Sequence, residues 1–158
     1  MIIVCDASPL IALSLCDKLD LLDTIFKEVV IPEMVYKEVS REGKPEAGKI
    51  AAWARGKVQK TGKQPLVQAI NFNLDAGESE AIALYWERSA DFLLIDEQRG
   101  RRLAAQSGIK IIGTLGILLL AKEKGLVSAV KPFLDQLWES PVRISHLLYQ
   151  DILKLANE

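Results

Sequence analysis

The 158-residue sequence is poor in residues that several common kinds of catalysis require. It holds two cysteines, Cys5 and Cys16, and their spacing fits neither a disulfide framework, a zinc knuckle nor a redox CxxC pair. We expect both to be buried apolar residues. Its one histidine, His146, is the single candidate base for a Ser-His or Cys-His pair, and we expect it to have a surface or capping role.

The sequence also lacks a long uninterrupted hydrophobic run. The longest strongly apolar stretch, residues 109–121, is interrupted by two glycines and a threonine and is shorter than the roughly 20 residues that span a bilayer. The first residues lack the basic segment and cleavage site of a secretory signal. We therefore expect a cytoplasmic protein with no membrane-spanning helix.

The sequence has no excess of positive charge that would indicate a nucleic-acid partner. It contains 20 Lys and Arg and 21 Asp and Glu, which gives a net charge of -1. Any basic surface must be local. The candidate clusters are Arg99, Arg101 and Arg102, and Arg55, Lys57, Lys60 and Lys63. Solvated charged faces explain such runs more often than RNA does. The intervals between Trp53, Trp86 and Trp138 suggest core or interface packing more than base stacking.

What the sequence has is a regular alternation of apolar strands and helical segments. The predicted strands are residues 2–5, 29–31, 57–60, 92–95 and 109–112. The predicted helices are residues 9–22 with a break near Asp17, 33–40, 47–54, 75–88, 99–107, 114–124, 128–138 and 145–156. This order predicts one α/β domain over residues 1–158, with a central, mainly parallel sheet between two layers of helices.

Two of the apolar strands run directly into an aspartate, Asp6 and Asp96. Since the carboxyl ends of parallel strands meet at one edge of a sheet, both carboxylates should emerge at that edge, where ligands bind in such folds. Aspartates there also cap helices and accept hydrogen bonds from loop amides, so the pair alone is weakly informative.

Two more acids lie within reach of the same edge. Glu38 is on the helix after the second strand, and Glu78 opens the helix before the Asp96 strand. Each also has an ordinary explanation: Glu38 could be an exposed charge beside Lys37, and Glu78 could stabilise a helix N-terminus.

The residues around these acids form a specific pattern. It comprises Asp-Ala-Ser-Pro-Leu-Ile at 6–11, Ile-Pro-Glu-Met-Val-Tyr-Lys-Glu at 31–38, Gly-Glu-Ser-Glu-Ala-Ile at 77–82, Leu-Leu-Ile-Asp-Glu at 93–97, Gly-Arg at 100–101 and Gly-Thr-Leu-Gly at 113–116. In order and approximate spacing, this resembles a PIN domain of the branch similar to VapC toxins. The resemblance covers nearly the whole chain.

The resemblance implies a three-layer α/β/α fold with an acidic pocket that binds Mg²⁺ or Mn²⁺ and cleaves RNA. The residues that match the family's four acids are Asp6, Glu38, Glu78 and Asp96. Better-known VapC proteins have Asp as the third acid, and nearby acids leave that match open between Asp75, Glu78 and Glu80; Glu97 adds a similar ambiguity to the fourth.

Metal binding fits the physical chemistry of such a cluster. Packed carboxylates repel one another unless a cation compensates, and Mg²⁺ prefers oxygen ligands and keeps several waters, so it needs no His or Cys. Asp6 and Asp96 would be the principal ligands, Glu78 would complete the shell, and Glu38 would orient water or act as general base. The supporting or phosphate-contacting candidates are Ser8, Arg101 and Thr114.

The resemblance also implies homodimers and often a small antitoxin partner. An apolar face including Leu13, Leu19 and Leu22 could bury against a second copy, although an ordinary core explains these residues equally well. The alternative function is a non-catalytic RNA- or protein-binding module. Two other folds that place Asp after the first strand are disfavoured. A phosphatase of the haloacid-dehalogenase type would have Asp at the position of Ser8, and a receiver domain would have Lys after the last strand, where Gly113 and Thr114 stand.

Overall fold

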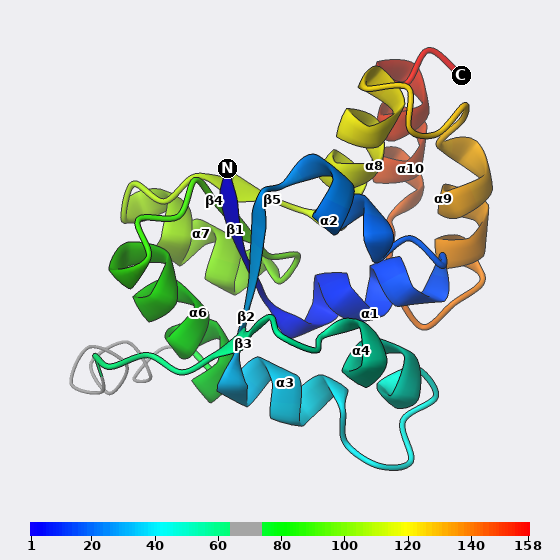
Figure 1. Ribbon diagram of the computed structural model, residues 1–158. Helices are drawn as coiled ribbons and strands as arrows, with labels where there is room; N and C mark the ends of the chain where they lie inside the picture. Colours follow the sequence, from blue (N-terminus) through cyan, green and yellow to red (C-terminus); the bar gives the residue numbers. More distant parts are fainter. Residues whose placement is uncertain (64–73) are drawn as a thin grey trace.

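The computed structural model describes residues 1–63 and 74–158, which form a parallel sheet covered by helices (Figure 1). The strands are β1 (Ile2–Cys5), β2 (Glu28–Pro32), β3 (Val58–Gln59), β4 (Phe92–Leu94) and β5 (Ile111–Ile112). The helices in these ranges are α1 (Ala7–Leu15), α2 (Asp20–Ile25), α3 (Glu33–Val39), α4 (Ala47–Trp53), α6 (Ala76–Glu87), α7 (Gln98–Gln106), α8 (Thr114–Glu123), α9 (Lys131–Trp138) and α10 (His146–Leu155). The predicted alternation of strands and helices is confirmed.

The sheet order is β3-β2-β1-β4-β5, and every neighbouring pair is parallel. The central strand β1 pairs with β2 on one side and β4 on the other, with Val4 opposite both Val30 and Leu93. Asp6 extends this pairing, because its backbone N–H donates to the Leu94 carbonyl over 2.9 Å. The chain therefore leaves β1 and β4 side by side at one edge of the sheet.

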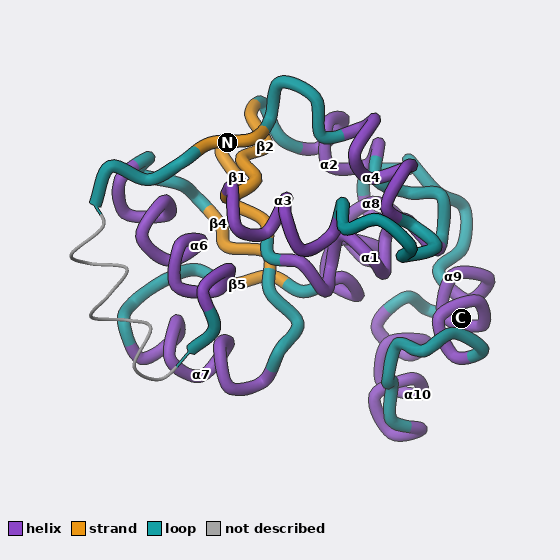
Figure 2. Tube along the Cα trace, turned by 90° about the horizontal axis from the view of Figure 1, so that it is seen from below, coloured by secondary structure: helices purple, strands orange, loops and turns teal. Residues whose placement is uncertain are grey.

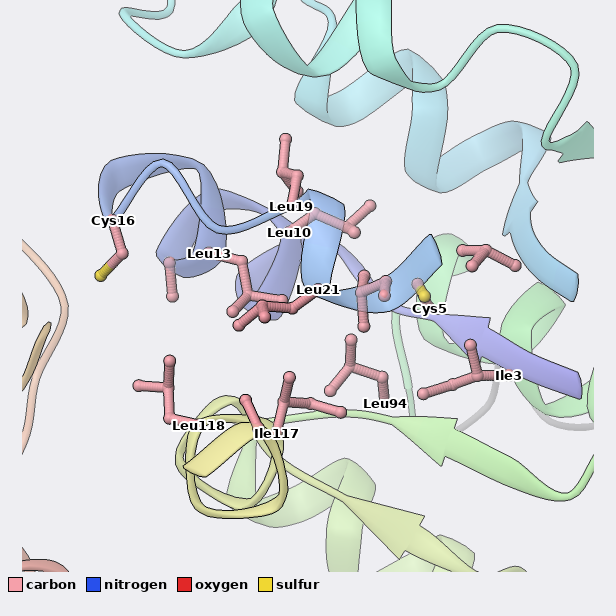
Figure 3. Packing of buried hydrophobic residues seen from close by; sticks show 14 of the residues in the cluster. Ile3, Cys5, Leu10, Leu13, Cys16, Leu19, Leu21, Leu94, Ile117 and Leu118 are labelled. Carbon is pink, nitrogen blue, oxygen red and sulfur yellow. The ribbon is translucent and has the colours of Figure 1, made fainter. Parts of the chain in front are cut away.

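Helices cover both faces of the sheet, which explains why its strands are apolar at successive positions. Ile3, Cys5 and Leu94 face α1, α2 and α8, and Figure 3 shows these residues packed against the leucines of α1 and Ile117 of α8. Val4 and Leu93 point to the opposite face and pack against α6 and α7. The helices α9 and α10 lie beyond α8, on the far side from α6 and α7 (Figure 2). The predicted three-layer α/β/α fold is confirmed.

Several local predictions are corrected. The predicted strand at residues 109–112 contributes only Ile111–Ile112, because the Ile109 N–H donates to the Ala104 carbonyl and closes the end of α7, with Gly108 in the left-handed conformation. Pro32 ends β2 and is the N-cap residue of α3. The helix predicted from residue 128 begins at Lys131.

The apolar side chains also divide differently from the expectation. Leu13, Leu19 and Leu22 are buried in the main core, so the ordinary explanation holds and they offer no free face for a second copy. Trp86 and Trp138 are 47% and 48% exposed, so of the two roles expected for them the core role is wrong and the interface role stays a prediction. Both free cysteines are buried and His146 is exposed, as predicted.

A buried carboxylate joins α6 to α3. Glu80 is 3% exposed, and its Oε2 accepts a hydrogen bond from the Met34 N–H over 2.8 Å, in the first turn of α3. Its Oε1 accepts a longer bond, 3.4 Å, from the Thr61 N–H. Glu80 thereby satisfies amide groups that the start of a helix and an adjoining loop leave without backbone partners.

Replacing Glu80→Ala should lower the free energy of unfolding by about 1–3 kcal/mol, because buried N–H groups lose their acceptor. Urea denaturation followed by circular dichroism measures the change. The control is Glu123→Ala, at an exposed position of α8, which should stay within about 0.5 kcal/mol of wild type. Equal stability of the two variants would contradict the structural role of Glu80.

Candidate functional site

The first acid of the site is Asp6, which follows β1 directly and is 4% exposed. Burial raises the pKa of Asp6 to about 7; the Ala7 backbone N–H lowers it, and the neighbouring carboxylates of Glu78, Asp75 and Glu38 raise it further. No ion pair joins Asp6 to a Lys or Arg in residues 1–63 and 74–158. Asp6 is therefore a buried acid whose charged neighbours are acids.

Glu78 is the neighbour that raises the pKa of Asp6 most. It lies in the first turn of α6, where it forms a capping box with Asp75: the Glu78 N–H donates to Asp75 Oδ1 over 2.8 Å, and the Asp75 N–H donates to Glu78 Oε2 over 3.2 Å. The other oxygen, Oε1, lies close to Gly100, where an added Cβ would be 3.1 Å away. Burial raises the pKa of Glu78 as well.

These contacts separate the three acids that the sequence left open. Asp75 is the N-cap of α6, and Glu80 is directed at the start of α3. One carboxylate oxygen of Glu78 accepts the hydrogen bond of the capping box, and the other lies toward α7. The geometry thus favours Glu78 as the third acid beside Asp6.

Glu38 reaches the same group from α3. Its carboxylate lies near the start of α6, with Oε2 at 3.7 Å from the position of a Cβ added at Gly77. Lys37 forms its ion pair with Glu33, over 3.8 Å, so it does not neutralise Glu38. Glu38 is half-buried and adds to the negative potential at Asp6.

Asp96 is held by the start of α8. Its Oδ1 accepts from the Thr114 N–H over 2.8 Å, and its Oδ2 accepts from the Thr114 hydroxyl over 2.6 Å. The helix-capping explanation considered for such aspartates therefore describes Asp96 here. Arg101 also turns inward, since its Nη1 donates to the Ile95 carbonyl over 2.8 Å. Two of the three supporting candidates, Arg101 and Thr114, thus contact the end of β4.

The donors present suit a hard divalent cation in their chemistry, because all are carboxylates and Asp6, the most buried of them, forms no ion pair within the described part of the chain. Within the described residues, however, no three His, Cys, Asp or Glu side chains are arranged to hold a metal ion. This is compatible with Mg²⁺, which is often bound through one or two carboxylates, with water and substrate phosphate completing its shell.

Among the hollows that adjoin the acids, two are lined by Lys44. One, of about 750 Å³, is bordered by Ser8, which is exposed, and by Asp96. A smaller one, of about 360 Å³, is bordered by Glu38 and Asp75. Lys44 lines both hollows and so lies between them.

The cations at these hollows are mainly ones that sequence reasoning did not select: Lys37, Arg41, Lys44 and Arg143. Arg41 and Lys44 follow Glu38 at intervals of three residues, and that spacing was a usable signal. Nothing local in the sequence places Arg143 nearby. Of the basic residues that were selected, Lys57 is paired with Asp23 over 3.3 Å.

A family model for the PIN domain matches residues 2–158. The chain is a PIN-domain protein. Proteins with this domain are generally nucleases that use divalent metal ions, which agrees with acids gathered at the carboxyl edge of the sheet. No curated protein and no solved structure matches the chain significantly. Among the described residues, no helix is long and apolar enough to cross a membrane.

Gly113 of the PIN domain is packed against the Asp96 group. A Cβ at this position would lie 2.8 Å from Asp96 Oδ1 and 2.9 Å from Arg101 Nη1. Both side chains are held by hydrogen bonds, so an added methyl must displace them.

Replacing Gly113→Ala should therefore lower the free energy of unfolding by about 1–3 kcal/mol, the usual cost of overpacking. Gly48→Ala is the matched control, because Gly48 lies in α4 with open space around its Cα. That change should raise stability by roughly 0.5–1 kcal/mol, since alanine favours helix over glycine. Thermal unfolding compares the two, and stabilisation by both would show that Gly113 is not tightly packed.

Proposed function

We propose that this PIN-domain protein is an endoribonuclease that depends on Mg²⁺ or Mn²⁺. The observation that carries the proposal is the buried Asp6 carboxylate, which has Glu78, Asp75 and Glu38 around it and no cationic partner in the described chain. Holding such a group ionised is costly unless a cation compensates. A divalent ion supplies that compensation, and the same ion attracts phosphate.

Asp6 and Glu78 would hold the ion, with Asp96 as a further carboxylate once the substrate is bound. When bound, such an ion activates water and stabilises charge on the phosphate and the leaving oxygen. The chain's own residues supply the rest. Glu38, half-buried at the start of α6, would orient the attacking water and take its proton.

The substrate's phosphates have cationic partners at the rim. Lys37, Arg41 and Lys44 border the hollow next to Glu38, so a strand whose scissile phosphate reaches Asp6 would place neighbouring phosphates on these cations. Arg101 and Thr114 act indirectly, because Thr114 fixes the carboxylate of Asp96 and Arg101 fixes the carbonyl before it.

By resemblance to VapC proteins, we extend the proposal to a cytoplasmic toxin that forms a homodimer and is restrained by a small antitoxin. The motifs that carry this resemblance are those around the four acids. Induced expression should arrest the growth of host cells, and a chain with Asp6→Asn should not. Growth arrest by both chains would contradict a toxin role that depends on the acids.

A second candidate function is a non-catalytic RNA- or protein-binding module. The observation in its favour is that the described residues contain no preformed three-ligand metal site and that Thr114 already occupies both oxygens of Asp96. Such a module would bind its partner with or without divalent metal.

The decisive experiment follows cleavage of a mixed RNA pool by the purified protein in Mg²⁺, Mn²⁺ or EDTA. Cleavage should require metal and should fall by roughly 100-fold or more in Asp6→Asn and in Glu78→Gln, because each removes a carboxylate that would hold the ion. Asp151→Asn, an exposed change on α10, is the matched control and should cleave normally.

If the protein binds RNA but leaves it intact in every buffer, the nuclease proposal is wrong and the binding module is the better explanation. Cleavage that survives both site substitutions would indicate a contaminating enzyme or a different site.

A further inference from the structure

The larger hollow is an apolar cleft that opens beside the acids. Its walls are Ile11 and Leu15 of α1, Val39 of α3, Pro45, and the pair Pro141 and Val142 from the segment between α9 and α10. Ser8, Asp96, Glu97 and Gln98 border the cleft on the side of the acids. At about 750 Å³, the cleft lies within the roughly 300–1,000 Å³ of typical small-ligand pockets.

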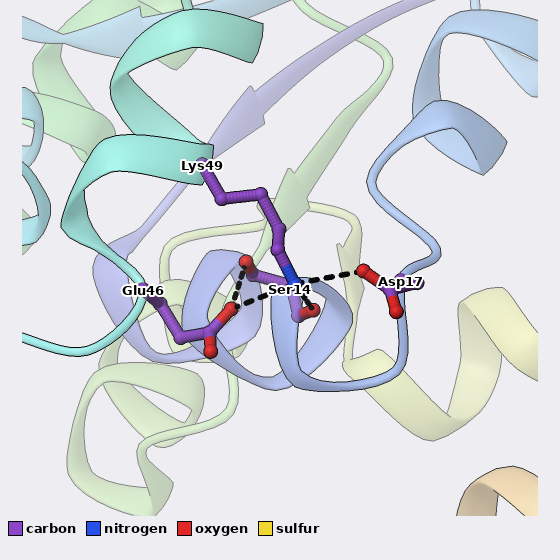
Figure 4. Close-up of polar contacts among 4 residues, drawn as sticks. All are labelled: Ser14, Asp17, Glu46 and Lys49. Carbon is purple, nitrogen blue, oxygen red and sulfur yellow. Dashed lines mark hydrogen bonds and ion pairs between the residues drawn. The ribbon is translucent and has the colours of Figure 1, made fainter.

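The one acid on the apolar side of the cleft is already neutralised. Glu46 accepts a hydrogen bond from the buried Ser14 hydroxyl and lies 3.4 Å from the ammonium group of Lys49. Lys49 also donates to Asp17 over 2.7 Å (Figure 4). This network ties the start of α4 to the end of α1 and fixes the wall that contains Lys44.

Two cations, Lys44 and Arg143, also line the cleft. Neither Lys44 nor Arg143 forms an ion pair within residues 1–63 and 74–158. They border the cleft from opposite segments, the α3–α4 connection and the α9–α10 connection. An apolar cavity flanked by two unpaired cations complements a flat aromatic group attached to phosphates.

We propose that this cleft binds one unstacked nucleotide of the RNA strand, its base against the apolar walls and its flanking phosphates on Lys44 and Arg143. The proposal rests on the proposed nuclease function and adds a specificity pocket to it. Ser8 and Gln98 provide polar side chains for the edge of the base. A base inside a duplex is stacked and paired, so only single-stranded segments present one to the cleft.

The test measures binding in EDTA, where metal-dependent cleavage does not occur. Fluorescence anisotropy compares labelled hexamers of uridylate and adenylate with a hexamer of abasic ribose phosphate, which has the same charge and no bases. Wild type should bind the base-containing hexamers about fivefold or more tightly, because base contacts add to the phosphate contacts. A duplex of longer uridylate and adenylate strands should show no such gain.

Three variants assign the effect to the cleft. Val142→Trp fills it from a loop position and should abolish the preference for bases while leaving binding of the abasic hexamer intact. Lys44→Gln and Arg143→Gln should weaken all three hexamers alike, whereas the control Lys124→Gln, exposed at the end of α8, should not. Circular dichroism checks that each variant is folded. The comparison of the hexamers on wild type tests the proposal without any variant.

Equal affinity of wild type for abasic and base-containing hexamers would overturn the proposal, and so would a base preference that survives in a folded Val142→Trp chain. Failure of the nuclease function gives a different pattern: the preference for bases persists, but RNA is never cut in Mg²⁺ or Mn²⁺.

Discussion

The burial of the Asp6 carboxylate beside other acids, at the carboxyl edge of the parallel sheet, governs the site. Asp6 is carried there by the central strand, Glu78 by α6 and Glu38 by α3, and the two glutamates add to the cost of ionising the buried Asp6. Water cannot relieve that cost fully, because Asp6 is buried. The fold therefore holds at this edge an arrangement that is favourable only with a proton or a cation in place.

The surrounding structure keeps the acids together despite this cost. β1 and β4 pair in the centre of the sheet between two packed helical layers, so the strand ends cannot separate. Glu80 anchors the start of α3, and the capping box with Asp75 fixes Glu78. Thr114 holds Asp96 at the start of α8. Stability from ordinary packing and capping thus offsets strain at the site, as is usual where function demands clustered charge.

The sequence predicted the layers and the edge well, because buried parallel strands are apolar throughout and two of them end in an aspartate. It could not choose between Glu78 and Glu80, which stand two positions apart on one helix and so point in directions about 200° apart. Packing alone decides which of them faces Asp6. The contacts of Asp96 with Thr114 and the approach of Arg143 to the cleft depend on long-range geometry that no local pattern encodes.

The most direct test is the difference in unfolding free energy between wild type and Asp6→Asn from pH 4 to 8.5, in EDTA and in Mg²⁺. The pKa of Asp6 is about 7 in the fold against its ordinary 3.8, so in between only the folded chain keeps this proton. In EDTA, wild type should therefore lose stability relative to the variant, by on the order of a few kcal/mol, as pH rises through that window. Above it, Mg²⁺ should stabilise wild type alone. Parallel curves without a metal effect would contradict a buried acid cluster built for a cation.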